Sequence, residues 1–262
     1  MQHHVVDGMR YLEAGAGWPV VLLHAFPLSA EMWRPQLADV PDGWRFIAPD
    51  LATLAASLPP QRDRTSATMD DYARGVAGLL DRLEIDRAII GGLSMGGYVT
   101  FALYRLSPER FSGAILADTR PQADSDEAKT NRTRMRELVA RQGPRAIADE
   151  MLPRLLSREA APEIAAEVRR IIETLPAQAI DAALAAMMAR PDSTADLARM
   201  SIPALVVVGE RDEVTPADEA ERMQARLPRA RLAVIPGAGH LANVERPHEF
   251  SQALHDFLVA PM

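Results

Sequence analysis

The sequence predicts an α/β fold in which helices cover both faces of a mostly parallel sheet. Short apolar runs flanked by turn residues recur along the 262 residues, and their hydrophobicity is continuous rather than alternating. Such runs are typical of strands that are buried on both faces. Segments with helical spacing lie between most of them. The runs are Val20 to Leu23, Phe46 to Ala48, Ala88 to Ile90, Ala114 to Ala117, Ala204 to Val208 and Leu232 to Ile235.

Apolar residues at helical spacing predict the helices that follow these strands. The clearest segments are Asp70 to Leu83, Gly96 to Leu106 and Pro247 to Leu258. Near the N-terminus, Val5 to Val6 and Met9 to Leu12 flank the turn Asp7-Gly8. This pattern predicts an antiparallel hairpin at the edge of the sheet.

The region from about Gln122 to Arg199 breaks this alternation, because it has no strand-like run and its apolar residues have helical spacing. Prolines at positions 144, 153, 162, 176 and 191 are expected to divide it into short helices. The sequence therefore predicts a core domain made of residues 1–121 and 200–262, with residues 122–199 forming a helical cap, or lid.

Composition argues against several classes of partner. The net charge is -7 and no Lys/Arg cluster is present, so we expect no nucleic-acid partner. The longest uncharged stretch, Ala88 to Tyr104, is shorter than the roughly 20 apolar residues that span a bilayer. Met1 to Glu13 lack the apolar stretch of a signal peptide. We expect a cytoplasmic protein without a membrane partner, and no pattern indicates its oligomeric state.

Cofactor chemistry is not indicated either. The chain has no cysteine, which excludes disulfides, thiolate metal sites and cysteine nucleophiles. It has no spacing typical of metal ligands, and the glycines around Ser94 lack the order of a dinucleotide fingerprint. We therefore expect no metal and no organic cofactor.

The strongest motif is Gly92-Leu93-Ser94-Met95-Gly96, which follows a predicted strand and opens a predicted helix. A serine at such a junction needs a sharp, strained turn, and small residues two positions before and after it allow the chain to approach. The first N–H groups of the helix stabilise negative charge. The motif predicts Ser94 as a nucleophile and the Met95 N–H as an oxyanion donor.

A serine hydroxyl needs a base, and two histidines lie just past a predicted strand. His240 follows the last strand in the loop that begins at Pro236, and it is the predicted general base. His24 ends an early strand before Ala25-Phe26-Pro27, where it is expected to hold a turn by hydrogen bonds. The remaining histidines, expected to be solvated, are His3, His4, His248 and His255.

The third member of a catalytic triad is a carboxylate at a strand end. Asp212, after the strand Ala204 to Val208, is the predicted residue that orients His240. Asp118, after the strand Ala114 to Ala117, is the alternative, and a contact with Arg120 is its expected structural role. The order Ser, Asp, His along the chain differs from that of chymotrypsin and subtilisin.

The chain resembles α/β-hydrolase-fold enzymes, most of all the carboxylesterase and 3-oxoadipate enol-lactonase-like branch. The resemblance implies an eight-stranded, mostly parallel sheet, a lid that selects the substrate, and the Phe26 N–H as second oxyanion donor. The segments that carry it are His24-Ala25-Phe26-Pro27, Pro49-Asp50-Leu51, Gly92 to Gly97, Gly209-Glu210-Arg211-Asp212, Gly239-His240 and Glu245-Arg246-Pro247.

Two departures from the family pattern affect the expected site. Ala25 replaces the glycine that usually follows the histidine, and it would strain or shift the oxyanion turn if that turn needs a positive φ. Leu51 to Ser57 replace an arginine- and glycine-rich turn. We expect this segment to be a remodelled, more apolar loop beside the site.

The sequence thus predicts a serine hydrolase that cleaves carboxylic esters of small to medium apolar substrates through an acyl-enzyme. The residues expected at the substrate pocket are His24, Ala25, Met135, Met187, Met188 and Leu241. A first alternative is an enol-lactone hydrolase, in which Arg120, Arg132 or Arg134 binds the substrate carboxylate. A second is a ligand-binding or sensor protein on the same fold, and a third is a perhydrolase side activity.

Overall fold

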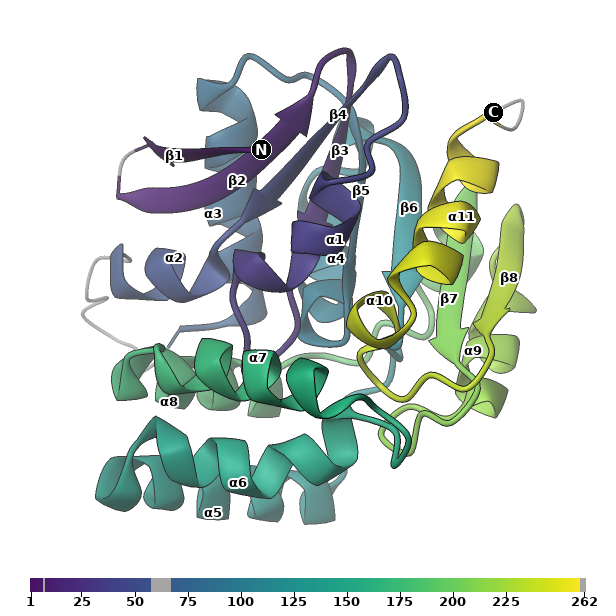
Figure 1. Cartoon of the computed structure of the whole chain (residues 1–262). Helices are drawn as coiled ribbons and strands as arrows, with labels where there is room; N and C mark the ends of the chain where they lie inside the picture. Colours follow the sequence, from purple (N-terminus) through teal and green to yellow (C-terminus); the bar gives the residue numbers. More distant parts are fainter. Residues whose placement is uncertain (7, 58–66, 260–262) are drawn as a thin grey trace.

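The computed structural model describes residues 1–6, 8–57 and 67–259, and within them eight strands form one sheet (Figure 1). The order is β1-β2-β4-β3-β5-β6-β7-β8, and all neighbours are parallel except β1 with β2 and β2 with β4. The predicted α/β fold with a mostly parallel sheet is confirmed. The strands are β1 (Gln2–Val6), β2 (Met9–Gly15), β3 (Trp18–Leu23), β4 (Trp44–Pro49), β5 (Ala88–Leu93), β6 (Phe111–Ala117), β7 (Ala204–Gly209) and β8 (Ala230–Ile235).

Every apolar run identified in the sequence lies inside a strand. β5 and β7 are buried along their whole length, as continuous hydrophobicity predicts. β8 is different: Val234 is 44% exposed, because this strand is the edge of the sheet and has a neighbour on one side only. β1 and β2 form the predicted hairpin, with Val6 opposite Met9. Asp7 of its turn lies outside the described residues.

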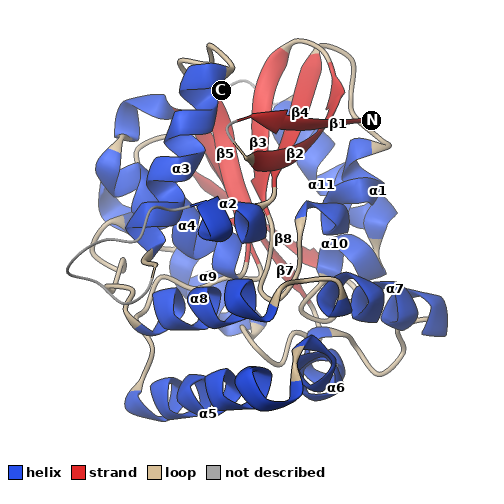
Figure 2. Cartoon of the chain, turned by 90° about the vertical axis from the view of Figure 1, so that its left-hand side faces the viewer, coloured by secondary structure: helices blue, strands red, loops and turns tan. Residues whose placement is uncertain are grey.

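Helices cover both faces of the sheet (Figure 2). On one face lie α3, α4 and α9, and the Phe101 side chain of α4 shares a core with Met223 of α9. On the other face α1 and α11 lie together, and Trp33 packs against Phe250 with ring centroids 5.9 Å apart. The bounds are α1 (Arg34–Leu37), α3 (Met69–Arg82), α4 (Met95–Leu106), α9 (Ala217–Gln224), α10 (Ala242–Glu245), α11 (Pro247–Leu258), and the 3-10 helices η1 (Ala30–Trp33), η2 (Pro108–Arg110) and η3 (Leu197–Arg199).

Four helices between β6 and β7 form a separate group below the sheet in Figure 1. They are α5 (Asp126–Gln142), α6 (Pro144–Leu155), α7 (Pro162–Glu173) and α8 (Ala177–Met188). Pro144 and Pro162 begin α6 and α7, where a missing N–H costs nothing. Pro153, expected to divide two helices, lies inside the last turn of α6, where a single helical hydrogen bond is lost.

The segment Leu51 to Ser57, predicted as a loop, is the helix α2 (Leu51–Ser57). Its Leu- and Ala-rich sequence has high helix propensity, and Asp50 Oδ1 accepts the N–H of Ala52 (3.1 Å) at its start. The apolar side chains of Leu51 and Leu54 are buried, and α2 packs against α8. The loop prediction is wrong because the apolar residues make a packed helix.

Among the described residues no single helix is long and apolar enough to cross a membrane. α7 and α8 reach that length and apolarity only as a pair, and the chain bends by 94° between them.

Candidate active site

Ser94 occupies a strained turn between β5 and α4, with φ 54° and ψ -110°. Its N–H donates to Ala117 O (2.9 Å), and its carbonyl accepts the Thr119 hydroxyl (2.8 Å). A Cβ at Gly92 would lie 2.6 Å from Leu23 O, so only glycine fits there. The neighbouring strands therefore hold Ser94 in a conformation that a free chain avoids, as is typical of functional residues.

Asp212 and His240 meet at the carboxyl ends of β7 and β8. The Asp212 Oδ2 to His240 Nδ1 distance is 2.8 Å, and both side chains are buried. Asp212 also accepts the Thr215 hydroxyl (2.6 Å) and the N–H groups of Val214 (2.7 Å) and Thr215 (2.9 Å). Four donors thus fix the carboxylate, which in turn fixes the imidazole ring.

The charge state of this pair follows from the same contacts. Burial raises the pKa of Asp212, but the attraction of His240 and the hydrogen bonds from His240 and Thr215 outweigh it and lower that pKa overall. A carboxylate on Nδ1 keeps the ring proton there. His240 Nε2 is then an acceptor, which is the form that a general base needs.

Ser94, Asp212 and His240 all lie at the same end of the sheet. Each follows the carboxyl end of a strand, and the strands β5, β7 and β8 run parallel. Among the described hydrogen bonds, none joins the Ser94 hydroxyl to His240. Catalytic hydrogen bonds often tighten only when substrate binds. The geometry thus pairs the predicted acid with the predicted base, and the assignment of the whole triad stays a prediction.

Asp118, the alternative acid, makes different contacts. It follows β6 with φ 42°, and its Oδ1 accepts the Gly209 N–H (2.8 Å). Its Oδ2 has no hydrogen-bond partner in the described part of the chain. Burial and the nearby Asp212 carboxylate raise the pKa of Asp118 well above its usual value. A hydrogen bond from Asp118 to the β7 backbone differs from both expectations, the contact with Arg120 and the bond to His240.

The two predicted oxyanion donors lie at neighbouring strand ends. Met95 is the first residue of α4, and Phe26 lies in the turn after β3. Neither backbone N–H donates to another residue of the described chain.

Ala25 is buried and is absent from the positive-φ residues of the described chain. The expected strain from alanine at this position is therefore not found.

These observations can be compared with known proteins. A family model described as "Alpha/beta hydrolase family" matches residues 20–253. The chain belongs to this family. The resemblance that the motifs predicted is thereby confirmed.

Relatives of this α/β-hydrolase include esterases and lactonases. An esterase from Thermogutta terrifontis, solved with malate bound, is 39% identical, with a TM-score of 0.90 over 98% of each chain. An enol-lactonase structure from Burkholderia xenovorans is 26% identical, with a TM-score of 0.84 over 99% of this chain and 100% of that one. The 3-oxoadipate enol-lactonase 2 of Acinetobacter baylyi is 29% identical over 238 residues, 90% of this chain and 86% of that enzyme. The predicted class, a carboxylic ester hydrolase, is confirmed by these relatives.

His24 holds the oxyanion turn of the α/β-hydrolase in place. Its Nε2 accepts the Leu51 N–H (2.9 Å), and its Nδ1 lies 2.9 Å from Ala25 O, so the proton is on Nδ1. Burial lowers the pKa of His24, although the nearby Asp50 carboxylate opposes this shift. A neutral ring thus links β3 to the start of α2, which agrees with the role expected from its sequence position.

We expect this buried histidine to make the hydrolase less stable at acidic pH. Below the unfolded pKa of about 6.5, the unfolded chain binds a proton that folded His24 excludes, so the free energy of unfolding falls as the pH falls. Urea unfolding at about pH 7.5 and about pH 5.5 measures this loss, and His24→Gln should show a smaller one. An equal loss in both proteins would show that His24 does not contribute.

A narrow cavity of about 20 Å³ reaches the predicted oxyanion donors and is large enough for one water. Of the expected pocket residues, His24 lines it, whereas Ala25, Met135, Met187, Met188 and Leu241 do not. Met135 and Met187 are buried in the main hydrophobic core, and their place at the substrate pocket stays a prediction. The lining residues that sequence reasoning missed are Leu51 and Ala52 of α2, Tyr72 of α3, Leu175, and Ala179, Ile180 and Ala183 of α8.

The three arginines considered for a substrate carboxylate differ in their partners. Arg132 donates to the buried Asp124, and Arg134 donates to Glu150. Arg120 lies 3.8 Å from Asp124, and its buried Nε has no hydrogen-bond partner within the described chain. Because Thr119 bonds Ser94 O, the residue that follows it is close to the catalytic turn. Of the three arginines, Arg120 is the one whose Nε–H has no hydrogen-bond partner in the described chain.

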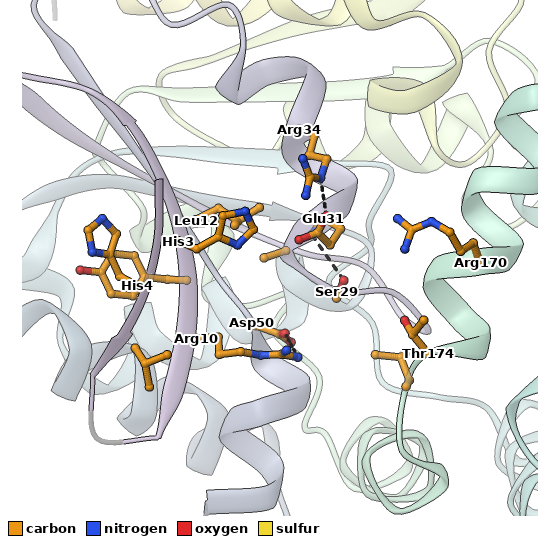
Figure 3. Close-up of a pocket in the computed structure, with 14 residues that line it drawn as sticks. His3, His4, Arg10, Leu12, Ser29, Glu31, Arg34, Asp50, Arg170 and Thr174 are labelled. Atoms are coloured by element: carbon orange, nitrogen blue, oxygen red, sulfur yellow. Dashed lines mark hydrogen bonds and ion pairs between the residues drawn. The ribbon is translucent and has the colours of Figure 1, made fainter. Parts of the chain in front are cut away.

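A second cavity, of about 430 Å³, lies beyond Asp50, between β1, β2, η1 and α7 (Figure 3). Each of its guanidinium groups has a carboxylate partner. The pairs are Arg10 with Asp50, Arg34 with Glu31, and Arg170 with Glu167. Asp50 and Glu31 line the cavity themselves, whereas Glu167 does not. Across the described ranges, no cluster of three His, Cys, Asp or Glu side chains suits a metal ion.

Proposed function

We propose that this α/β-hydrolase cleaves carboxylic esters of small to medium apolar substrates through an acyl-enzyme on Ser94. His240 is the general base, and Asp212 orients it. The observation that carries this proposal is the hydrogen bond between Asp212 and His240 Nδ1. It lies at the same end of the sheet as the strained Ser94. Relatives named esterase and enol-lactonase support the same class of reaction.

The mechanism follows from the proton positions. His240 Nε2 takes the proton of the Ser94 hydroxyl, and the oxygen attacks the ester carbonyl. The N–H groups of Met95 and Phe26 stabilise the resulting oxyanion, since neither is used elsewhere in the described chain. The imidazolium then protonates the departing alcohol. Water, deprotonated by His240, attacks the acyl-enzyme and releases the acid and free Ser94.

Helices α5 to α8 are proposed to act as the cap, within residues 122–199. α8 supports this role, because Ile180 and Ala183 line the cavity that also contacts His24, Phe26 and Met95. Apolar walls around few polar groups are typical of sites for apolar ligands. A cytoplasmic location stays a prediction.

Enol-lactone hydrolysis is the second candidate, and Arg120 favours it. Its unpaired Nε would suit the carboxylate of an anionic lactone. Two relatives are named enol-lactonases, and the Thermogutta terrifontis esterase was solved with a dicarboxylate, malate, bound. The observation that distinguishes the two candidates is therefore the charge of the preferred substrate.

Rates with p-nitrophenyl acetate, butyrate and octanoate, compared with 3-oxoadipate enol-lactone, test the proposal. We expect turnover of the neutral esters, because the residues beside the predicted oxyanion donors are mostly apolar. Arg120→Gln should leave those rates unchanged, as should the control Arg134→Gln. A strong preference for the anionic lactone, lost in Arg120→Gln alone, would establish the second candidate instead. Inactivity on every substrate would favour a sensor, and acceleration by peroxide a perhydrolase.

A further inference from the structure

Glu245, the last residue of α10, is a buried carboxylate that the proposed mechanism does not use. Its exposed fraction is 3%, and its strongest contacts among the described residues are hydrogen bonds rather than an ion pair, although the Arg211 guanidinium is near enough to attract it. A buried charge without an ion pair is costly unless N–H groups satisfy it. The hydrogen bonds of the Glu245 carboxylate therefore indicate its structural role.

The carboxylate joins two segments that are far apart in the sequence. Its Oε1 accepts the Gly239 N–H (2.9 Å), and its two oxygens lie 3.2 and 3.0 Å from the Ser157 N. Gly239 directly precedes His240, whereas Ser157 follows α6. A backbone bond from Leu241 N to Leu155 O (3.0 Å) joins the same two segments on the other side of His240.

Gly239, Ser157 and Glu245 are in close contact at this junction. A Cβ at Gly239 would lie 2.6 Å from Ser157 N and 2.8 Å from Glu245 Oε1. Behind the junction, a cavity of about 460 Å³ is lined by Leu156, Ser157 and Asp212. Leu156 and Ser157 thus lie between the bonds to the His240 loop and this cavity. If the two bonded segments parted, both His240 and its partner Asp212 would lose support on that side.

We propose that Glu245 is a positioning residue that ties the His240 loop to the end of α6, so that the proposed cap and the catalytic base are held as one unit. This inference rests on the proposed role of His240. Charged hydrogen bonds to two backbone N–H groups fix both segments more firmly than an apolar side chain could. The position of α6 therefore sets the position of the imidazole.

Two substitutions break the tie from opposite ends. Glu245→Gln removes the negative charge and replaces Oε2, one of the two oxygens that face the Ser157 N–H, with a donor amide. Ser157→Pro removes the Ser157 N–H and places a ring carbon against the Glu245 carboxylate, so that the two segments must part there. The residue before it allows proline, because Leu156 already has an extended backbone, φ -118° and ψ 147°. Ser157→Ala is the matched control, since it keeps the N–H and removes a hydroxyl that has no partner in the described chain.

The measurement is kcat and KM for p-nitrophenyl acetate, expressed per active site titrated by the initial burst. Loss of one charged hydrogen bond that holds the base should lower kcat about tenfold in Ser157→Pro and about 10- to 100-fold in Glu245→Gln. KM should change little, and Ser157→Ala should match the wild type. The double variant should be no slower than Glu245→Gln, because both remove the same connection.

A purely structural Glu245 would give another result. Both variants would then melt at lower temperature but keep wild-type kcat per titrated site, and this outcome would overturn the inference. His240→Ala separates it from the proposed function: if that variant stays active, His240 is not the base. Amide hydrogen exchange at Gly239 and Leu241 then tests directly whether the His240 loop is held to the end of α6. Faster exchange in Ser157→Pro than in Ser157→Ala supports it, and equal exchange overturns it.

Discussion

Replacing Ser94 by alanine is expected to lower kcat for p-nitrophenyl butyrate by about 10⁵- to 10⁶-fold, the loss typical of removing a serine nucleophile. The methyl group of alanine cannot form the acyl bond, while the strained turn and the helix N-terminus remain. The residual rate should come from the N–H groups of Met95 and Phe26 acting on bound ester. Steady-state rates at matched protein concentration measure the effect.

Ser251→Ala is the control for this substitution. Ser251 is also buried, but it lies on α11 on a face of the sheet. Its replacement should leave kcat unchanged. If Ser94→Ala kept more than about a hundredth of the wild-type rate, another group would be the nucleophile.

Asp212→Asn is expected to lower kcat about 10⁴-fold. An amide in this position can present its NH₂ group to His240 Nδ1 and so favour the tautomer whose proton is on Nε2. That tautomer cannot accept the Ser94 proton. The existing bonds from Thr215 and Val214 hold the side chain in place, so the loss is chemical rather than a loss of fold.

Asp118→Asn tests the alternative acid with the same change of charge. The asparagine oxygen can still accept the Gly209 N–H, which is the one hydrogen bond that the Asp118 side chain makes with the described backbone. We expect kcat within about threefold of the wild type. The reverse pattern, a large loss in Asp118→Asn and a small one in Asp212→Asn, would make Asp118 the catalytic acid.

Much of the fold could be predicted from the sequence because its signals are local. Continuous apolar runs such as Ala204 to Val208 become buried strands, and the glycines around Ser94 are required by close backbone contacts. The pairing of Asp212 with His240 was also predictable, since each follows a strand and parallel strands bring their carboxyl ends together.

Features that depend on tertiary packing could not be predicted in this way. Leu51 to Ser57 form a helix that packs against α8, a contact that no local pattern encodes. Tyr72, Leu175 and Ile180 reach the cavity from three separate segments. The methionines of the cap region stay a prediction for the substrate pocket, because flexible side chains also fill the space between helices. The role of Glu245 required the distances to Gly239 and Ser157.

The most direct test of the central claim is to capture the covalent intermediate. The wild-type chain, mixed with an alkyl p-nitrophenyl phosphonate, should gain the mass of one phosphonyl group and release one equivalent of p-nitrophenol. Peptide mapping should place the group on Ser94, and Ser94→Ala should gain no mass. A modification on any other residue, or labelling that persists in Ser94→Ala, would contradict the proposed acyl-enzyme mechanism.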